Sequence, residues 1–434
     1  MATSLGIGLT LSSPGQPFWP SQLPRIGGAL PDLYLNTDAA RFARLEAGKH
    51  IALSASQLAA RISSTGPAQV IADGIGGDTN LSISENGLPM SFAGLQAHPT
   101  VTRLHGVFPA NGTDNGAISG PLATEGIFSP WRIVSDGAIW HRRRSTAFST
   151  VAGTPMGFAV LWRAGQGNHG RITFYNTAAG TTTISDGAIG AIATSGADFG
   201  PVTNLSQTQF TDGNWLVTGV FTPNATLSGA AELRIGPDGA TAGDYVDVLC
   251  AQVTNTPYSY ADWIIGGTGA ATLAANRTTL GFGGGAFAFV AEINLKGLTP
   301  GSSVRLLDWN DGSATNRISL AKGGADVFSM QLARGGYIGQ AAAGSYAGAG
   351  VMTYYGVAAD NYVRLGSTDV ADSPVNAGLG AMPTINTLAF DGVGYDNSTD
   401  RAYKYLKRFC QWPLSAGSDA VFNAAKAIAQ DWAA

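Results

Sequence analysis

Apolar and polar residues alternate along much of the chain, in short runs separated by turn-forming residues. Met156, Phe158, Val160 and Trp162 occupy every second position of one run, and the segment AFAFVAEINL at 286–295 alternates in the same way. A period of two places one set of side chains on one face of a β-strand. Because Gly, Asn, Asp and Thr lie between the runs, we expect turns there. The pattern predicts strands at 155–165, 170–176, 213–223, 230–239, 286–295, 303–310, 315–322, 326–334, 351–359, 361–367 and 385–394.

Helical spacing occurs near both ends of the chain. In the segment 37–63, Asp38 is a candidate N-cap and Ala39, Phe42 and Leu45 recur every three residues, which predicts a short helix, with a second at 54–62. At 415–434, Ser418 or Asp419 is placed to cap a helix with one apolar stripe, made of Val421, Phe422, Ala425, Ile428, Ala429 and Trp432. That stripe must pack on a sandwich or on a neighbouring subunit.

Composition supports a mainly β fold. Glycine accounts for 59 of 434 residues, charged residues for 12% and hydrophobic residues for 44%. A chain so poor in charge and so rich in apolar residues can bury a large core, which excludes general disorder. We therefore predict an irregular N-terminal docking segment, two β-sandwich (jelly-roll or lectin-like) domains and a short C-terminal helix. The expected parts are an extended N-terminal arm at 1–35, a small mixed α/β docking domain at 36–110, a jelly roll at 111–265, a linker at 266–280 and a second sandwich with the helix at 281–434.

The net charge and the absence of targeting signals argue against two classes of partner, nucleic acids and membranes. The net charge of -4 gives no basic field for nucleic acid, so we expect no nucleic-acid partner. Cys250 and Cys410 lie in apolar runs far apart, which favours buried free thiols. The N-terminal segment lacks the charged and apolar parts of a signal peptide, and no run reaches 18 apolar residues, so we expect no membrane insertion.

Catalytic motifs are missing from the sequence. It contains no G-x-S-x-G, H-E-x-x-H, P-loop or C-x-x-C, and its five histidines are scattered. We therefore expect no enzymatic activity and no cofactor. A glycosidase would need two carboxylates about 5 to 9.5 Å apart. Candidates without a recognisable context are Glu125, Asp136, Glu232, Glu292 and Asp308.

Two segments are candidate ligand sites. In WHRRRS at 140–145, Trp140 and His141 precede Arg142, Arg143 and Arg144, which together offer an aromatic plate and planar donors for the carboxylates of an acidic glycan. The alternatives are a solvated strand with alternating arginines or a salt-bridged subunit contact.

The segment DWNDG at 308–312 is a weak candidate for calcium, through Asp308 and Asp311. The alternative is an Asx turn that joins two strands. In the Pro-rich first 35 residues, Phe18 and Trp19 are candidate docking anchors, although the same composition fits a disordered tail.

Three segments, in this order, carry a resemblance to a known family: VAGTPMGFAVLWRAG at 151–165, GNWLVTGVFTP at 213–223 and IGPDGATAGDYVDVLCAQVTNTPYSYADW at 235–263. They resemble the carbohydrate-binding-module-like jelly roll of bacteriophage tail proteins. The matches to its penultimate strand and closing motif are Tyr245, Val246, Val248, Ala251, Gln252, Pro257, Ser259 and Tyr260. The Arg that usually follows the mid-domain Trp is absent, since Leu216 and Val217 follow Trp215.

The C-terminal part is similar to concanavalin A-like (laminin-G-type) sandwiches at the ends of phage fibres. The segments that carry this similarity are AFAFVAEINL at 286–295, TLAFDGVGYDNS at 387–398, RAYKYLKRFCQWPLS at 401–415 and the trailing helix.

Taken together, the resemblance implies a tail-fibre or head-fibre type virion protein on the particle surface. Its N-terminal part would dock to other virion proteins of the tail, baseplate or capsid, and its sandwiches would bind a host cell-surface polysaccharide. Such fibres are homo-oligomers, usually trimers. The alternatives are a capsular polysaccharide depolymerase and a purely structural decoration or baseplate protein without glycan binding.

Overall fold

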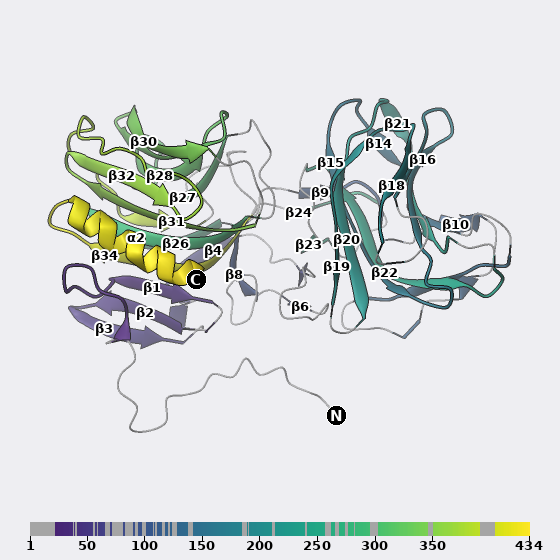
Figure 1. The fold of residues 1–434 in the computed structure, drawn as a ribbon, viewed down its shortest axis with the longest axis horizontal. Helices are drawn as coiled ribbons and strands as arrows, with labels where there is room; N and C mark the ends of the chain where they lie inside the picture. Colours follow the sequence, from purple (N-terminus) through teal and green to yellow (C-terminus); the bar gives the residue numbers. More distant parts are fainter. Residues whose placement is uncertain are drawn as a thin grey trace, which may run out of the picture. The chain divides into compact units, whose positions relative to one another are not determined.

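The computed structural model shows a mainly β protein that divides into two compact units (Figure 1). Unit 1 draws on residues 1–68, 83–99 and 275–434, and unit 2 on 69–82 and 100–274. The structure describes residues 22–37, 39, 41–54, 57–58, 60–65, 70–71, 81–82, 90–91, 94–97, 101–106, 108, 111–114, 118–119, 122–123, 128–137, 142–184, 189, 191–210, 213–238, 241–256, 262–264, 269–273, 277–281, 283–295, 303–345, 350–390 and 404–434.

Unit 1 is a sandwich of two antiparallel sheets. The first sheet has the order β3 (Lys49–Leu53), β2 (Arg41–Glu46), β1 (Leu33–Asn36), β34 (Lys404–Pro413), β26 (Phe287–Leu295), β31 (Gly350–Ala359) and β32 (Tyr362–Ser367), with β8 (Gly94–Ala97) also on β34 and β7 (Met90–Ser91) on β8. The second has the order β30 (Tyr337–Ser345), β29 (Val327–Arg334), β28 (Asn316–Lys322), β27 (Val304–Asn310), β33 (Thr387–Ala389), β25 (Arg277–Gly281) and β4 (Ile62–Thr65).

The core of unit 1 fills the space between these sheets. The ring of Phe287 on β26 lies 4.7 Å from the ring of Trp309 on β27, centroid to centroid, and both side chains are fully buried. The alternation predicted for 286–295 puts Phe287 and Phe289 on one face of β26. Both rings contact Trp309, so this face packs against the opposite sheet. Its other face carries Ala288 and Val290, which are also buried.

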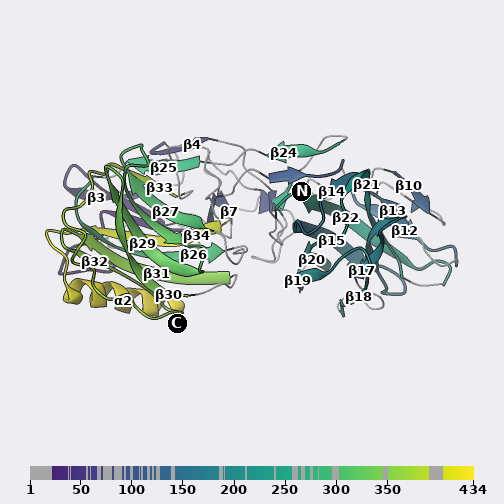
Figure 2. The ribbon, with the colours of Figure 1, turned by 90° about the horizontal axis from the view of Figure 1, so that it is seen from above.

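A C-terminal helix covers that second face. Helix α2 (Asp419–Ala433) begins where the Ser418 hydroxyl accepts a hydrogen bond from the Val421 N–H, as an N-cap does. Its buried residues Phe422, Ala425 and Ala429 join Ala288, Val290, Tyr355, Val357, Cys410 and Trp412 in one cluster. The predicted stripe is thus confirmed, and it docks on its own sandwich; Figures 1 and 2 show α2 in yellow along β26 and β31.

Unit 2 is a second sandwich. One sheet has the order β11 (Ile118–Ser119), β12 (Trp131–Val134), β22 (Tyr245–Thr254), β15 (Met156–Ala164), β20 (Asn214–Phe221) and β19 (Val202–Gln209), with β9 (Val101–Arg103) on β22 and β24 (Ala271–Leu273) on β9. The other has the order β10 (Asn111–Asp114), β13 (Arg142–Arg144), β21 (Leu227–Gly236), β16 (Arg171–Asn176), β17 (Gly180–Ile184) and β18 (Thr194–Ala197), with β14 (Phe148–Thr150) on β21. A small third sheet joins β23 (Asp262–Trp263), β5 (Val70–Ile71) and β6 (Leu81–Ser82).

Aromatic rings link the two main sheets of unit 2. Phe174 on β16 stacks on Phe221 of β20 with ring centroids 4.0 Å apart, and it meets Phe158 of β15 edge-on at 5.3 Å. Strand β15 is buried on both faces because Phe128 and Trp263 also cover Ala159 and Leu161 on its outer side. The mainly β fold and the predicted strands are confirmed; at 385–394 the described strand is Thr387–Ala389, and 391–394 lie outside the described residues.

The helix predicted within 37–63 is wrong. Residues 41–53 form the hairpin of β2 and β3, with positive φ at both turn residues, Ala47 (48°) and Gly48 (76°). Positive φ at both central positions belongs to a type I′ turn, whose twist suits paired strands. The three-residue spacing was misleading because β2 pairs with β1, and β1 pairs with β34 from the far end of the sequence. Part of the helix predicted at 54–62 lies outside the described residues.

The two units also differ from the predicted parts. Strand β1 spans the boundary between the predicted arm and the predicted 36–110 domain, and β1–β3 extend a sheet of unit 1, whereas β9 from the same stretch belongs to unit 2. The predicted linker at 266–280 includes β24 and most of β25, which pairs with β4 and β33. These pairings join residues far apart in sequence, so local patterns do not show them. Among the described residues, no helix is long and apolar enough to span a membrane.

Candidate functional site

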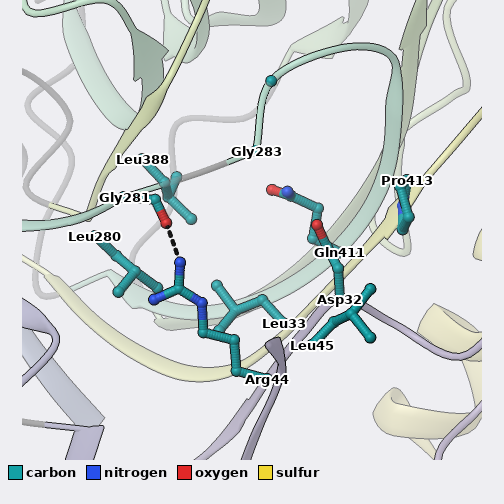
Figure 3. Close-up of a pocket in the computed structure, with 11 residues that line it drawn as sticks. Asp32, Leu33, Arg44, Leu45, Leu280, Gly281, Gly283, Leu388, Gln411 and Pro413 are labelled. Atoms are coloured by element: carbon teal, nitrogen blue, oxygen red, sulfur yellow. Dashed lines mark hydrogen bonds between the residues drawn. The ribbon is translucent and has the colours of Figure 1, made fainter. Parts of the chain in front are cut away.

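A pocket of about 290 Å³ opens in unit 1 and is lined from β1, β2 and β34 of one sheet and from β25 and β33 of the other (Figure 3). Its walls combine leucine and proline side chains with three polar side chains and a glycine-rich rim. The lining residues are Asp32, Leu33, Arg44, Leu45, Leu280, Gly281, Gly283, Gly284, Leu388, Gln411 and Pro413. A pocket of this volume lies at the lower end of the range for small-molecule sites.

Strand pairing places Asp32 at the pocket. Asp32 directly precedes β1, where Leu33 lies opposite Gln411 on one side and Arg44 on the other. The Asp32 N–H donates to the Gln411 carbonyl at 2.8 Å, and the Asp32 carbonyl accepts from the Leu45 N–H at 2.8 Å. Backbone hydrogen bonds on both sides therefore fix the position from which the carboxyl group projects.

Arg44 ties the two sheets together beside the pocket. A terminal nitrogen of its guanidinium on β2 donates to the carbonyl of Gly281 on β25 at 2.8 Å, the dashed line in Figure 3. Because this bond joins one sheet to the other, Arg44 keeps its cationic group at the pocket wall.

Gln411 is fully buried on β34, and its amide orientation is fixed. The Gln411 Oε1 atom accepts a hydrogen bond of 2.7 Å from the indole N–H of Trp309. The amide nitrogen must therefore point the other way. Among the described residues, Gln411 Nε2 has no hydrogen bond of ordinary geometry, although it is buried; it lies beside the Asp32 carboxyl and interacts with it closely enough to lower the pKa of Asp32.

Asp32 likewise has a buried polar atom without an ordinary hydrogen bond, in this case an acceptor. Its Oδ1 atom is buried and has no hydrogen bond of ordinary geometry. Burial raises the pKa of Asp32 from its ordinary 3.8 to about 6, and a weak hydrogen bond from the Gln411 side chain and the charge of Arg44 offset only part of this rise. A buried polar atom without a partner costs free energy, so native proteins seldom leave two such atoms in one place without a reason.

The pocket thus offers a donor and an acceptor that lack hydrogen bonds of ordinary geometry, and a cation, beside apolar walls. A sugar hydroxyl both donates and accepts hydrogen bonds, so a pair of hydroxyls can satisfy Gln411 Nε2 and Asp32 Oδ1 together. The leucine side chains can contact the C–H groups of a sugar ring. Among the described residues that line the pocket, Asp32 is the one carboxylate, whereas hydrolysis of a glycosidic bond ordinarily uses two.

The arginine segment predicted as a glycan contact is partly described. Arg142, Arg143 and Arg144 form β13 in unit 2 and are half-buried, while Trp140 and His141 lie outside the described residues. Arg144 lies 3.5 Å from Glu232, which Arg234 also contacts at 2.7 Å. The three arginines thus form a strand, as in the alternative of a strand with alternating arginines, and contact of this segment with a glycan stays a prediction.

The two calcium candidates have separate hydrogen-bond partners. Asp308 is fully buried and accepts from Asn310 Nδ2 at 2.7 Å and Ser319 Oγ at 2.6 Å. Burial raises the pKa of Asp308 to about 7. Asp311 accepts from the Ser313 N–H at 3.0 Å, as in an Asx turn, and hydrogen bonds lower its pKa. Among the described residues no group of three or more His, Cys, Asp or Glu side chains could hold a metal ion.

The other predicted residues are scattered. Glu292 pairs with Lys407 at 3.3 Å and with Arg408, and Asp136 is exposed. The positions Glu125, Phe18 and Trp19 lie outside the described residues, so docking through Phe18 and Trp19 stays a prediction.

Sequence reasoning missed the pocket residues. Asp32 and Arg44 stand in segments without any motif, and Gln411 stands in a segment that carried a resemblance of fold only. The three residues meet because β1 pairs with both β2 and β34. A polar residue within the apolar segment RFCQWPL, at Gln411, was the one available signal.

Comparisons with known proteins give little further information. No family model matches the chain, and no curated protein matches it. Among solved structures, the mouse laminin α1 chain domains LG4-5 align at 10% identity over 68% of this chain and 91% of that one, with a TM-score of 0.21. A mutant of the GH43 protein BlXynB from Bacillus licheniformis aligns at 12% identity over 69% and 68%, with a TM-score of 0.22. Similarities with TM-scores this low do not inform the function of the chain.

Proposed function

We propose that this chain is a glycan-binding fibre or spike protein of a bacteriophage virion, and that the pocket of unit 1 holds a sugar of the host-surface polysaccharide. The observation that carries the binding proposal is the pair of buried atoms without ordinary hydrogen bonds, Gln411 Nε2 and Asp32 Oδ1, in one pocket. Placement on a virion, on a tail or head fibre, is supported by the sequence resemblance alone.

Sugar binding would relieve an existing cost. In the free protein this donor and this acceptor are desolvated and only weakly bonded to each other, and a buried group left without its hydrogen bond costs about 1–3 kcal/mol. A ligand with adjacent hydroxyl groups recovers that free energy on binding, without further ordering of the pocket. A single sugar in a pocket of about 290 Å³ makes few contacts, so each site is weak. Several copies of the chain in a homo-oligomer would raise the overall affinity through effective concentration.

Binding without hydrolysis is the favoured activity. Asp32 is the one carboxylate among the described lining residues, and Arg44 is engaged with Gly281. The depolymerase alternative would need a second carboxylate within about 5 to 9.5 Å of the first. The decoration or baseplate alternative would leave the two buried polar atoms without a role.

A binding assay with purified host polysaccharide and a glycan array tests the proposal. We expect wild-type protein to bind at least one neutral oligosaccharide, and Asp32→Ala to weaken that binding about tenfold or more, because an acceptor is lost in a desolvated site. Asp431→Ala is the matched control, since Asp431 is an exposed carboxylate on α2. It should bind as the wild type does.

Three results would change the conclusion. Absence of any glycan bound by an oligomeric preparation would favour a purely structural protein. Release of reducing ends from the polysaccharide would favour the depolymerase. Equal loss of binding in Asp32→Ala and Asp431→Ala would remove the pocket from the argument. Labelling phage particles with an antibody to this chain, followed by electron microscopy, separately tests placement on a virion.

A further inference from the structure

Among the described residues, no carboxylate forms an ion pair with Arg143 in unit 2. Its Nε atom is buried and has no hydrogen-bond partner, and desolvation lowers the pKa of its guanidinium. In the described part of the chain, its side chain contacts Trp131, whose ring lies 4.5 Å from the guanidinium carbon. The desolvation of a buried charge is normally offset by an opposite charge. The partly buried guanidinium of Arg143 has an aromatic ring beside it but no such opposite charge among the described residues.

The position of Arg143 in the sandwich explains how this arises. Arg143 lies opposite Ile235, a fully buried core residue of β21, so both side chains project from the inner face of their sheet. Trp131 lies opposite Val248, a core residue on β22 of the other sheet. The side chains of Arg143 and Trp131 therefore meet between the two sheets at the rim of the core. Arg143 and Trp131 both remain partly exposed.

Glu232, a described carboxylate on the neighbouring strand β21, does not pair with Arg143. Glu232 serves two arginines, with Arg144 at 3.5 Å and Arg234 at 2.7 Å. These lie on the outer face, since Arg144 is opposite Arg234 and alternates with Arg143.

We propose that Arg143 and Trp131 form a second binding site, which takes the carboxylate of an acidic sugar such as a hexuronate. Of the guanidinium nitrogens, Nε is buried, so the outer edge with its two Nη atoms is the one that a ligand can reach. Two parallel N–H donors match the two oxygens of a carboxylate, and they match two oxygens of phosphate or sulfate as well, so preference for a sugar acid over a small anion must come from contact of the sugar ring with Trp131. The indole of Trp131 offers an apolar edge for the sugar ring. This site extends the proposed function to charged glycans but rests on separate residues from those of the pocket.

The test is calorimetric titration of the full chain at low salt with a disaccharide of glucuronic acid, the matching neutral glucose disaccharide and sodium sulfate. We expect the glucuronate to bind more tightly than the other two. Arg143→Gln should weaken glucuronate binding about tenfold or more, as expected for loss of hydrogen bonds from a charged group. Arg143→Lys keeps the charge but loses the paired donors, so its affinity should fall between those of the wild type and Arg143→Gln.

Two control variants separate this site from the pocket of unit 1 and from a general effect of net charge. Arg25→Gln removes one exposed charge in unit 1 and should leave glucuronate binding unchanged. Asp431→Ala removes one exposed carboxylate outside both sites and should also leave it unchanged. Weaker binding of neutral sugar in Asp32→Ala and weaker binding of glucuronate in Arg143→Gln are separate readouts, so a failure of the pocket and a failure of this site are distinguishable. The melting temperature of each variant establishes that unit 2 is folded; if Arg143→Gln unfolds, Arg143→Lys decides the outcome.

Several results would overturn the proposal. Equal affinity for the glucuronate and the neutral disaccharide would show that the carboxylate of the sugar does not contribute to binding. Equal binding of sulfate would show a non-selective anion contact only. Unchanged affinity in Arg143→Lys and Arg143→Gln would place the glucuronate elsewhere.

Discussion

The buried carboxyl of Asp308 makes the stability of unit 1 depend on pH, and Asp308→Asn should remove that dependence. The side chain is fully buried in the core beside Trp309, and burial raises its pKa from 3.8 to about 7. Below pH 3.8 the folded and unfolded chains both hold the proton. As the pH rises to about 7, the unfolded chain loses the proton while the folded chain keeps it, so the free energy of unfolding falls.

The size of this effect follows from the two pKa values. A difference of about 3 pH units, at 1.36 kcal/mol per unit, amounts to about 4 kcal/mol of lost stability above pH 7. Asparagine has nearly the same shape and no charge, and it can still hydrogen-bond to Ser319 and Asn310. We therefore expect Asp308→Asn to stabilise unit 1 by up to about 4 kcal/mol at pH 8 and to be nearly neutral at pH 4.

Urea unfolding between pH 4 and pH 8 measures the free energy of unfolding of both proteins. The fluorine signal of a fluorinated Trp309 reports the unfolding of unit 1 alone. The matched control is Asp311→Asn, since Asp311 is a near neighbour whose pKa is lowered rather than raised. It should not stabilise unit 1 at pH 8. An Asp308→Asn protein that is less stable than the wild type at pH 8 would refute the reasoning. A rise in wild-type stability on adding calcium chloride, abolished in both variants, would instead support the calcium site.

Three further predictions concern other parts of the molecule. His105 is buried in unit 2 with both ring nitrogens bonded to the backbone, and its pKa is lowered to about 4 by burial. Unit 2 should therefore keep its full stability above about pH 6.5 and lose up to about 3 kcal/mol as the pH falls to 4. His105→Gln should flatten this profile in urea unfolding, and an unchanged slope would contradict the assignment. At the pocket, sugar affinity should rise as the pH passes through about 6, because ionised Asp32 is the stronger acceptor. Calorimetry from pH 5 to pH 8 should show a flat profile for Asp32→Asn, and a flat wild-type profile would be inconsistent with contact to this carboxyl. Gly200→Ala would place a Cβ atom 2.1 Å from the Thr222 carbonyl oxygen at a φ of 140°, which should cost unit 2 about 2–4 kcal/mol. Gly196→Ala, also at positive φ but in open space, should cost less in thermal unfolding, and equal losses would show that crowding is not the cause.

The local pattern determined the secondary structure well where one face of an element is buried. The strand Phe287–Leu295 and the helix Asp419–Ala433 follow from side-chain periods of two and of about 3.6, and the Ser418 cap follows from its place before the apolar stripe. Burial against a core selects these periods in every such element, so the sequence records them. The mainly β class was predictable for the same reason.

The pattern failed where pairing between distant segments decides the conformation. Residues 41–53 read as partly helical, yet they form a hairpin because β1 pairs with β34 and gives β2 a partner. The division into units failed for the same reason, since β4 and β25 bring residues 62–65 and 277–281 into one sheet. Hydrogen bonds between strands have no signature in either strand alone.

Both candidate sites depend on tertiary structure to different degrees. The sequence singled out Arg143 as one of three consecutive arginines, but only the sandwich places it over Trp131 and leaves it unpaired. Nothing in the sequence singled out Asp32 or Arg44, because a pocket is a property of where chain segments meet. The sequence alone determines the residue types and their alternation. The burial of Asp32 and of the Gln411 amide nitrogen arises only when β1 pairs with β34 in the folded protein.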